Sequence, residues 1–193
     1  MRPCDENEVV EIVRAAMAQS RRLQWCGGGS KRDIGAADED SALVDLRGLQ
    51  GIIDYDPSEL VLTVRAGTPW AEIERALAAE RQMLACEPLD VAGCFGRSPG
   101  EMTMGGLVAS GLSGPRRVVA GSVRDHVLGF RAVSGRGDLF VGGGKVVKNV
   151  TGYDLPKLLT GSWGRLAALT EVTLKVLPAP EKVCVVALQG LEA

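Results

Sequence analysis

Three consecutive glycines, followed by a hydroxyl and two cations, form the first candidate site: Gly27-Gly28-Gly29-Ser30, then Lys31 and Arg32. Glycine has no Cβ, so the backbone N–H groups of such a run can approach an anion closely. The lysine and the arginine add positive charge beside it. The run fits a loop that holds phosphate groups, or a plain flexible turn, and the residues alone leave both interpretations open.

Other patterns that could do chemistry fail on their spacing. Gly142-Gly143-Gly144-Lys145 is followed by Val146, where a P-loop needs a hydroxyl for magnesium. The same run is not a dinucleotide fingerprint, because that motif would require glycine at Val147. His126 is the only histidine. We therefore expect no Ser-His-Asp or Cys-His catalytic site and interpret His126 as structural.

The composition excludes several classes of protein. A net charge of −2 over 193 residues argues against a nucleic-acid binder, whose affinity comes largely from basic side chains. No run of about 18 uncharged apolar residues predicts a membrane span, and the acidic N-terminus is unlike a signal peptide. The five cysteines are scattered without a C-x-x-C pair, so we expect no metal site, free thiols and a cytoplasmic location.

Glycine is in excess, and most of it lies in the second half of the chain. Seventeen of the 25 glycines fall between Gly93 and Gly164, without a collagen period and with only 9 prolines. We interpret this excess as loops and short helices in which the main chain must approach something closely.

The elements that would position the glycine loop are predicted to form an α/β lobe over residues 1–87. Apolar residues at helical spacing predict a helix over 5–22, and Thr68-Pro69 is typical of the start of another, with Thr68 as the N-cap. Between and after them, alternating apolar residues and turn signals predict strands over 23–26, 42–46, 51–55, 60–66 and 82–86.

Residues 88–193 predict a second lobe with a mainly antiparallel sheet. After a loop over 87–102, consecutive strands dominate and helices are short. The predicted helices cover 104–111 and 153–159, and the predicted strands cover 127–133, 138–141, 168–177 and 183–188. The expected fold class is therefore α+β, with the two lobes forming one compact unit.

Five sequence blocks that follow the glycine loop carry a family resemblance: DLRGLQGIIDYDPSELVLTVRAGTPWAEIE, MGGLVASGLSGPRR, GSVRDHVLG, KVVKNVTGYDL and EVTLKVLPAP. From Pro3 to about Glu181 the chain resembles the FAD-binding (PCMH-type) domain of the vanillyl-alcohol oxidase/p-cresol methylhydroxylase flavoproteins. More narrowly, it resembles the FAD-binding subunits of bacterial glycolate oxidases (glycolate dehydrogenases). The resemblance implies a two-lobed domain with FAD between the lobes.

The resemblance also implies which residues hold FAD. The pyrophosphate loop would be Gly27, Gly28, Gly29 and Ser30; the flavin and ribityl chain would be lined by Pro88, Thr103, Gly105, Gly106 and Ser110; Gly121 and the main chain of Leu169 complete the site. Many relatives carry a flavin-bonded histidine where Gly29 stands here, so we expect non-covalent FAD. Lys148, Asn149, Tyr153 and Asp154 are expected to brace the turn beside the cofactor or to be solvated.

Two departures from the family pattern limit what the resemblance implies. The segment that often reads GSEGTLG is Gly161-Ser162-Trp163-Gly164-Arg165-Leu166-Ala167 here, which alters the adenine contacts. The cap domain that would supply the substrate site is absent from the 193 residues. No residue is therefore assigned a catalytic role, and we expect the chain to be inactive alone.

The function that the resemblance implies is that of a FAD-dependent oxidoreductase component. It would oxidise a small 2-hydroxy acid such as glycolate to the 2-oxo acid by hydride transfer to flavin N5. Electrons would pass to other subunits of a complex, including an iron–sulfur subunit. Two alternatives stay open: a relative that acts on D-lactate or another alcohol, and a FAD-binding scaffold or electron-transfer module with no activity of its own.

Overall fold

The computed structural model describes residues 1–34, 40–96, 102–145, 152–187 and 190. Its helices are α1 (Glu6–Ala18), α2 (Trp70–Ala79), α3 (Met104–Ser110), α4 (Arg117–Ala120), α5 (Val123–His126) and α6 (Leu155–Leu159), with 3-10 turns η1 (Leu46–Gly48) and η2 (Ala92–Phe95). Its strands are β1 (Leu23–Cys26), β2 (Ala42–Asp45), β3 (Ile52–Asp56), β4 (Val61–Arg65), β5 (Gln82–Met83), β6 (Val127–Ser134), β7 (Leu139–Gly143), β8 (Ala167–Lys175) and β9 (Leu177–Pro178).

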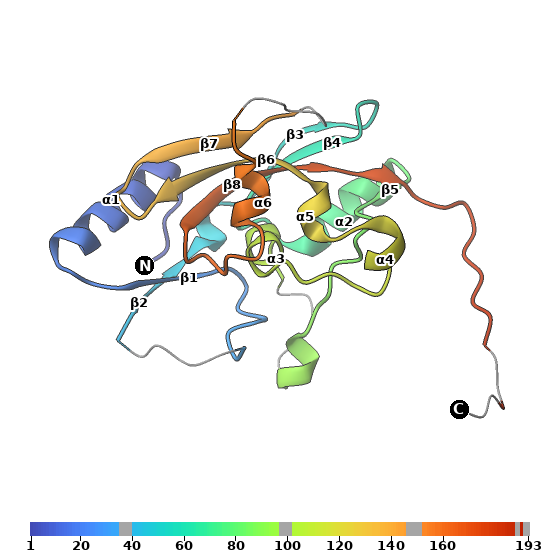
Figure 1. The fold of residues 1–193 in the computed structure, drawn as a ribbon, viewed down its shortest axis with the longest axis horizontal. Coiled ribbons are helices and arrows are strands. Elements are labelled where there is room, and N and C mark those ends of the chain that lie inside the picture. The colour runs from blue at the N-terminus through green and yellow to red at the C-terminus, as the bar shows by residue number, and fades with distance from the viewer. Residues whose placement is uncertain (35–39, 97–101, 146–151, 188–189, 191–193) are drawn as a thin grey trace.

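Five strands form the central sheet, in the order β3-β4-β8-β6-β7, and every pairing in it is antiparallel (Figure 1). The middle strand, β8, is buried along most of its length. Its neighbour β4 is buried at four of five positions. A strand covered on both faces needs apolar or paired side chains throughout, which the run Ala167–Lys175 supplies.

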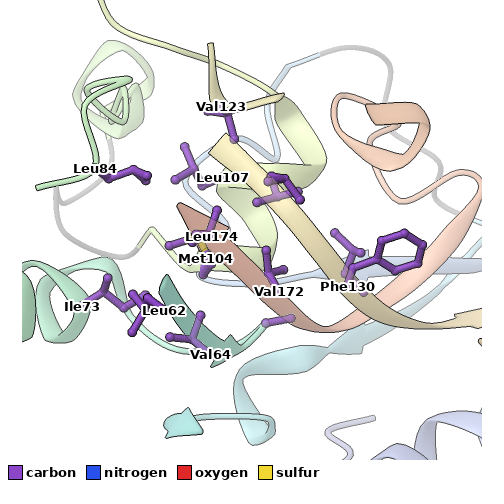
Figure 2. Packing of buried hydrophobic residues seen from close by; sticks show 14 of the residues in the cluster. Leu62, Val64, Ile73, Leu84, Met104, Leu107, Val123, Phe130, Val172 and Leu174 are labelled. Carbon is purple, nitrogen blue, oxygen red and sulfur yellow. The ribbon is translucent and has the colours of Figure 1, made fainter. Parts of the chain in front are cut away.

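The two faces of the sheet support two separate core clusters. Ala132 and Leu169, which lie opposite each other, belong to the larger cluster, and the next pair, Val133 and Ala168, belongs to the smaller one. Successive side chains of a strand point to opposite faces, so the clusters lie on opposite sides of the sheet. Figure 2 shows the larger cluster, in which side chains of α2 and α3 pack on β4 and β8.

Helix α1 and the parallel pair β1–β2 cover part of the other face. The first turn of α1 is fastened to the sheet by Glu6, which accepts hydrogen bonds from Arg131 at 2.6 Å and from Thr170 at 2.5 Å. Elsewhere in the sheet, the hydroxyls of Thr63 in β4 and Thr173 in β8 form a hydrogen bond at 3.0 Å. The chain between β1 and β2 carries the glycine loop, so the packing of α1 also positions that loop.

The α+β class with a mainly antiparallel sheet is confirmed. Strands β3 and β4 come from the predicted first lobe and β6, β7 and β8 from the second, so strands from both sides of residue 87 share one sheet. The lobe boundaries 1–87 and 88–193 stay a prediction.

Several predicted elements differ in detail. Pro69, not Thr68, is the N-cap residue of α2. The Thr68 hydroxyl accepts instead from the Gly51 N–H at 3.0 Å and donates to the Arg65 carbonyl at 2.7 Å. Residues 183–187 are extended and exposed but form no strand, and the chain runs away from the body after β9 (Figure 1). Helices α4 and α5 were not predicted, since four residues are too few to show a period.

Candidate functional site

A cavity of about 1150 Å³ is lined by the glycine loop, by helix α3 and by the loop that precedes β8. Five cations contribute to its wall: Arg21, Arg22, Lys31, Arg32 and Arg165. Among the described residues that line it there is no carboxylate. Arg22 is paired with Asp40 at 3.1 Å, outside the lining. The excess of cations on a concave wall gives a positive potential, so the cavity favours an anionic ligand.

The glycine loop lies directly against the start of α3. A Cβ at Gly27 would overlap the Thr103 hydroxyl oxygen and lie 3.3 Å from the Thr103 Cβ. That hydroxyl is the N-cap of α3, since Thr103 Oγ1 accepts from the Gly106 N–H at 3.3 Å. Gly29 has a φ of 80°, which glycine adopts without strain. Close approach and backbone conformation therefore explain two of the three glycines.

Helix α3 is held in place by the strand end and turn that precede α2. The Met104 N–H donates to the Thr68 carbonyl at 3.0 Å, and the Gly105 N–H donates to the Ala66 carbonyl at 2.7 Å. A Cβ at Gly105 would come within 2.8 Å of the Ala66 Cβ. Gly105 is thus required for the packing of α3 against the chain after β4.

The loop over residues 160–166 closes a third side of the cavity. It is bonded to the end of α3, because the Gly161 N–H donates to the Val108 carbonyl at 3.0 Å and the Trp163 N–H donates to the Ala109 carbonyl at 2.8 Å. Gly164, with a φ of 70°, lies on the indole of Trp25, where a Cβ would be 3.2 Å from Cδ1. The loop, α3 and β1 therefore form one connected wall.

Burial affects the charge of the glycine loop. Desolvation is the main cause that lowers the pKa of Lys31, opposed by the charge of Asp90. The Lys31 ammonium donates to the Ser30 hydroxyl at 3.3 Å, and Ser30 itself is only 5% exposed. An anion in the cavity would replace the water that the ammonium has lost.

The structure brings most of the predicted site residues to this cavity. Gly27, Gly28, Gly29, Ser30, Thr103, Gly106 and Ser110 line it. Gly105, Gly121, Pro88 and Leu169 are not among the residues that line it. As contacts of a cofactor, all eleven stay predictions.

The four residues outside the lining have local structural roles. Gly121 ends α4 at a φ of 83°. Pro88 forms an isolated bridge with Ser113. The Leu169 side chain lies in the larger core cluster, beside Ala168, which does line the cavity.

Some lining residues were missed. Arg21, Arg22, Gln24, Trp25, Ser134 and Gly135 contribute to the wall. The adjacent arginines before β1 were a signal in the charge pattern. Ser134 is brought to the cavity by the β6–β8 pairing, in which it lies opposite Ala167, and Gly135 follows it. The four residues expected to brace the turn beside the cofactor, or to be solvated, have different positions. Asp154 caps α6 and Tyr153 is 93% exposed, while Lys148 and Asn149 lie outside the described residues.

Two groups that could do chemistry elsewhere lie in the interior. His126 is 1% exposed, with Nε2 at 2.9 Å from the Ala120 carbonyl oxygen and Nδ1 at 3.3 Å from that of Lys175. This is the structural role that its isolation in the sequence indicates. Burial raises the pKa of the Cys86 thiol to about 12, so this thiol is not a nucleophile near neutral pH.

The described residues hold no group of three or more His, Cys, Asp or Glu placed to bind a metal ion. Every helix among them is too short or too polar to cross a bilayer. The wall does fit a dinucleotide. The cavity exceeds the roughly 300–1,000 Å³ of a drug-sized pocket, its cations suit a pyrophosphate, and glycines let the main chain approach.

Comparisons with known proteins agree with this geometry. The model of a family described as "FAD binding domain" matches residues 1–143. The glycolate oxidase subunit GlcE of Escherichia coli (strain K12) is 46% identical over 93% of this chain and 49% of its own length. D-2-hydroxyglutarate dehydrogenase of Xanthomonas citri pv. viticola is 32% identical over 98% of this chain and 39% of its own.

A solved structure shares the fold. Alkyldihydroxyacetonephosphate synthase superposes with a TM-score of 0.72 at 22% identity, over 94% of this chain and 32% of that one. The chain therefore spans about half the length, or less, of the proteins that it matches.

Proposed function

The chain belongs to the FAD-binding domain family, and from this premise we propose that FAD occupies the cavity between the glycine loop and α3. The observation that carries this proposal is the wall itself, in which five cations and no described carboxylate surround a loop closed tightly on Thr103. When bound, FAD supplies a ring system that accepts a hydride equivalent, and the protein supplies binding and orientation.

In this proposal, main-chain groups and charged side chains both bind the cofactor. The N–H groups of the loop that begins at Gly27 would donate to the pyrophosphate, which no Cβ keeps at a distance. Lys31 and Arg32 would balance its charge. Loop 160–166, bonded to the end of α3, would exclude water from the opposite side.

Attachment of FAD is non-covalent in this proposal, because Gly29 stands where many members of the family carry the histidine that bonds to the flavin. Precipitation of the flavin-loaded protein with trichloroacetic acid tests this point. We expect the flavin to stay in the supernatant. Flavin that remains in the washed pellet would contradict non-covalent attachment.

The proposed reaction is the oxidation of a small 2-hydroxy acid to the 2-oxo acid. The names of the relatives support this class, since glycolate, D-2-hydroxyglutarate and D-lactate are all 2-hydroxy acids. The carbon that bears the hydroxyl would lose a hydride to the flavin, and the hydroxyl would lose its proton to a base. Residues for the acid would come from outside these 193 residues, so we propose that this chain alone is inactive.

We propose further that the chain works as one subunit of a complex, as the name of the glycolate oxidase subunit suggests for that relative. Electrons would leave to a partner, for which an iron–sulfur subunit is the proposal. Five free thiols agree with a reducing compartment, which we propose is the cytoplasm. A second candidate is a FAD-binding module without activity of its own, because the wall accounts for cofactor binding and no described residue is assigned to the acid.

One experiment tests the proposal in two steps. The purified chain is titrated with FAD, and we expect a yellow protein that retains flavin on gel filtration. A protein that retains none overturns the proposal. The loaded chain, with the rest of its protein or complex present, is then mixed anaerobically with glycolate or D-lactate. Bleaching of the flavin band supports the oxidoreductase, and its absence with both acids favours the inactive module.

A further inference from the structure

Trp163 has a backbone conformation that its residue type does not favour. Its φ is 56°, in the left-handed region, where a side chain with a Cβ is strained. The two other left-handed residues of the same loop, Gly161 and Gly164, are glycines and adopt this region without cost. Glycine or asparagine at position 163 would therefore suit the loop better.

The fold makes little use of the Trp163 side chain. Among the described residues, the indoles of Trp25 and Trp70 pack against the two core clusters, and that of Trp163 packs against neither. Trp163 is 43% exposed and is attached to α3 through its backbone N–H, a bond that any residue except proline would make. Backbone strain that is not offset by packing of the side chain is a feature of binding sites.

Trp163 does line the cavity. Arg165, two residues further on, and the glycine loop line the same cavity. A ligand that suits both kinds of side chain carries phosphates and a flat aromatic ring. We propose that the Trp163 indole stacks on one of the two planar ring systems of FAD. This inference rests on the proposed function, since it assigns a ring contact in that site.

Substitution by glycine tests the proposal, because it removes the ring and the backbone strain together. For Trp163→Gly we expect an unchanged or higher melting temperature without FAD, and a Kd for FAD about tenfold higher, as loss of one aromatic stack implies. Trp163→Phe keeps a ring and should stay within about threefold of the wild type. Trp70→Phe, which packs against the larger core cluster and is not among the residues that line the cavity, is the matched control and should leave the Kd unchanged.

Fragments of the cofactor identify the ring. The Kd values of the wild type and Trp163→Gly are compared with ADP, which has the adenine, and with FMN, which has the flavin. A tenfold loss with either one assigns the stack to that ring, and a loss with neither overturns the proposal. A fall in melting temperature with an unchanged Kd for FAD also overturns it, because the ring would then serve the fold.

Failure of this inference differs from failure of the proposed function. If the wild-type chain binds no FAD, the proposed function fails first. If the wild type binds FAD and Trp163→Gly binds it equally well, only the stacking contact fails. Should the glycine variant not fold, Trp163→Asn removes the ring and tolerates the left-handed backbone, and the same comparison applies.

Discussion

The contact between Gly27 and Thr103 predicts a large and specific cost for Gly27→Ala. The new methyl group would overlap the Thr103 hydroxyl, which is buried and caps α3. Overpacking costs about 1–3 kcal/mol and displacement of the cap about 1 kcal/mol more. We expect the free energy of unfolding to fall by about 2–4 kcal/mol, which lowers the melting temperature by about 5–15 °C for a domain of this size.

A double-mutant cycle identifies the cause. Thr103→Ala removes the hydroxyl that the methyl group would strike, at a cost of about 1–2 kcal/mol for the lost cap. Adding Gly27→Ala to it should then cost little, so the two changes couple by about 2 kcal/mol in urea denaturation. Gly93→Ala is the matched control, because nothing lies within 4 Å of a Cβ there. Additive effects of the two changes, or a neutral Gly27→Ala, would refute the reasoning.

Three further predictions concern other parts of the molecule. The Arg131 hydrogen bond is the main cause that lowers the pKa of Glu6, so its stabilisation is present above the ordinary pKa and is lost as the pH falls through the folded-state pKa. Glu6→Gln should lower the melting temperature by about 2–4 °C at pH 7, and this difference should shrink as the pH falls through the folded-state pKa of Glu6. Desolvation, and after it the charge of Glu6, raise the pKa of Glu171, which contributes the opposite slope; Glu6→Gln removes the second of these causes and so weakens that slope. Iodoacetamide at pH 8 should label the three exposed thiols and leave Cys86 unlabelled until the protein unfolds, as mass spectrometry would show; rapid labelling of Cys86 in the native protein would contradict its burial. His126→Phe should cost about 1–3 kcal/mol in urea denaturation, because the buried imidazole loses the hydrogen bond that its N–H donates to one of the two neighbouring carbonyl oxygens; a neutral change would contradict this.

The sequence predicted the long elements well because their periods are strong. Helix α1, strand β4 and the β6–β7 hairpin were predicted within about four residues, since apolar spacing and turn residues agree there. It did not predict that strands from both predicted lobes share a sheet. The pairing of β4 with β8 joins residues about 110 positions apart, and no local pattern encodes it.

The candidate site shows the same division between local and long-range signals. The glycine loop and Thr103 were found from sequence blocks. The cations at Arg21 and Arg22 were missed, because a charged residue at the end of a helix is usually a solvated one. Gly105 was predicted as a lining residue, yet what determines glycine there is contact with Ala66 on the other side of α3. The sequence alone therefore does not distinguish a residue that lines the cavity from one that lies next to a lining residue.

The central place of β8 bears on how the protein is made. Strands pair with it on both sides, yet it is the last of the five to leave the ribosome. Until then β3–β4 and β6–β7 are two separate hairpins, and β4 and β6 each present an open edge to other nascent chains. Loop 160–166, which closes the cavity, emerges just before β8. If FAD binds at the proposed site, it would therefore be bound only after almost all of these residues have been synthesised, and a shortage of FAD would leave the completed sheet without its cofactor.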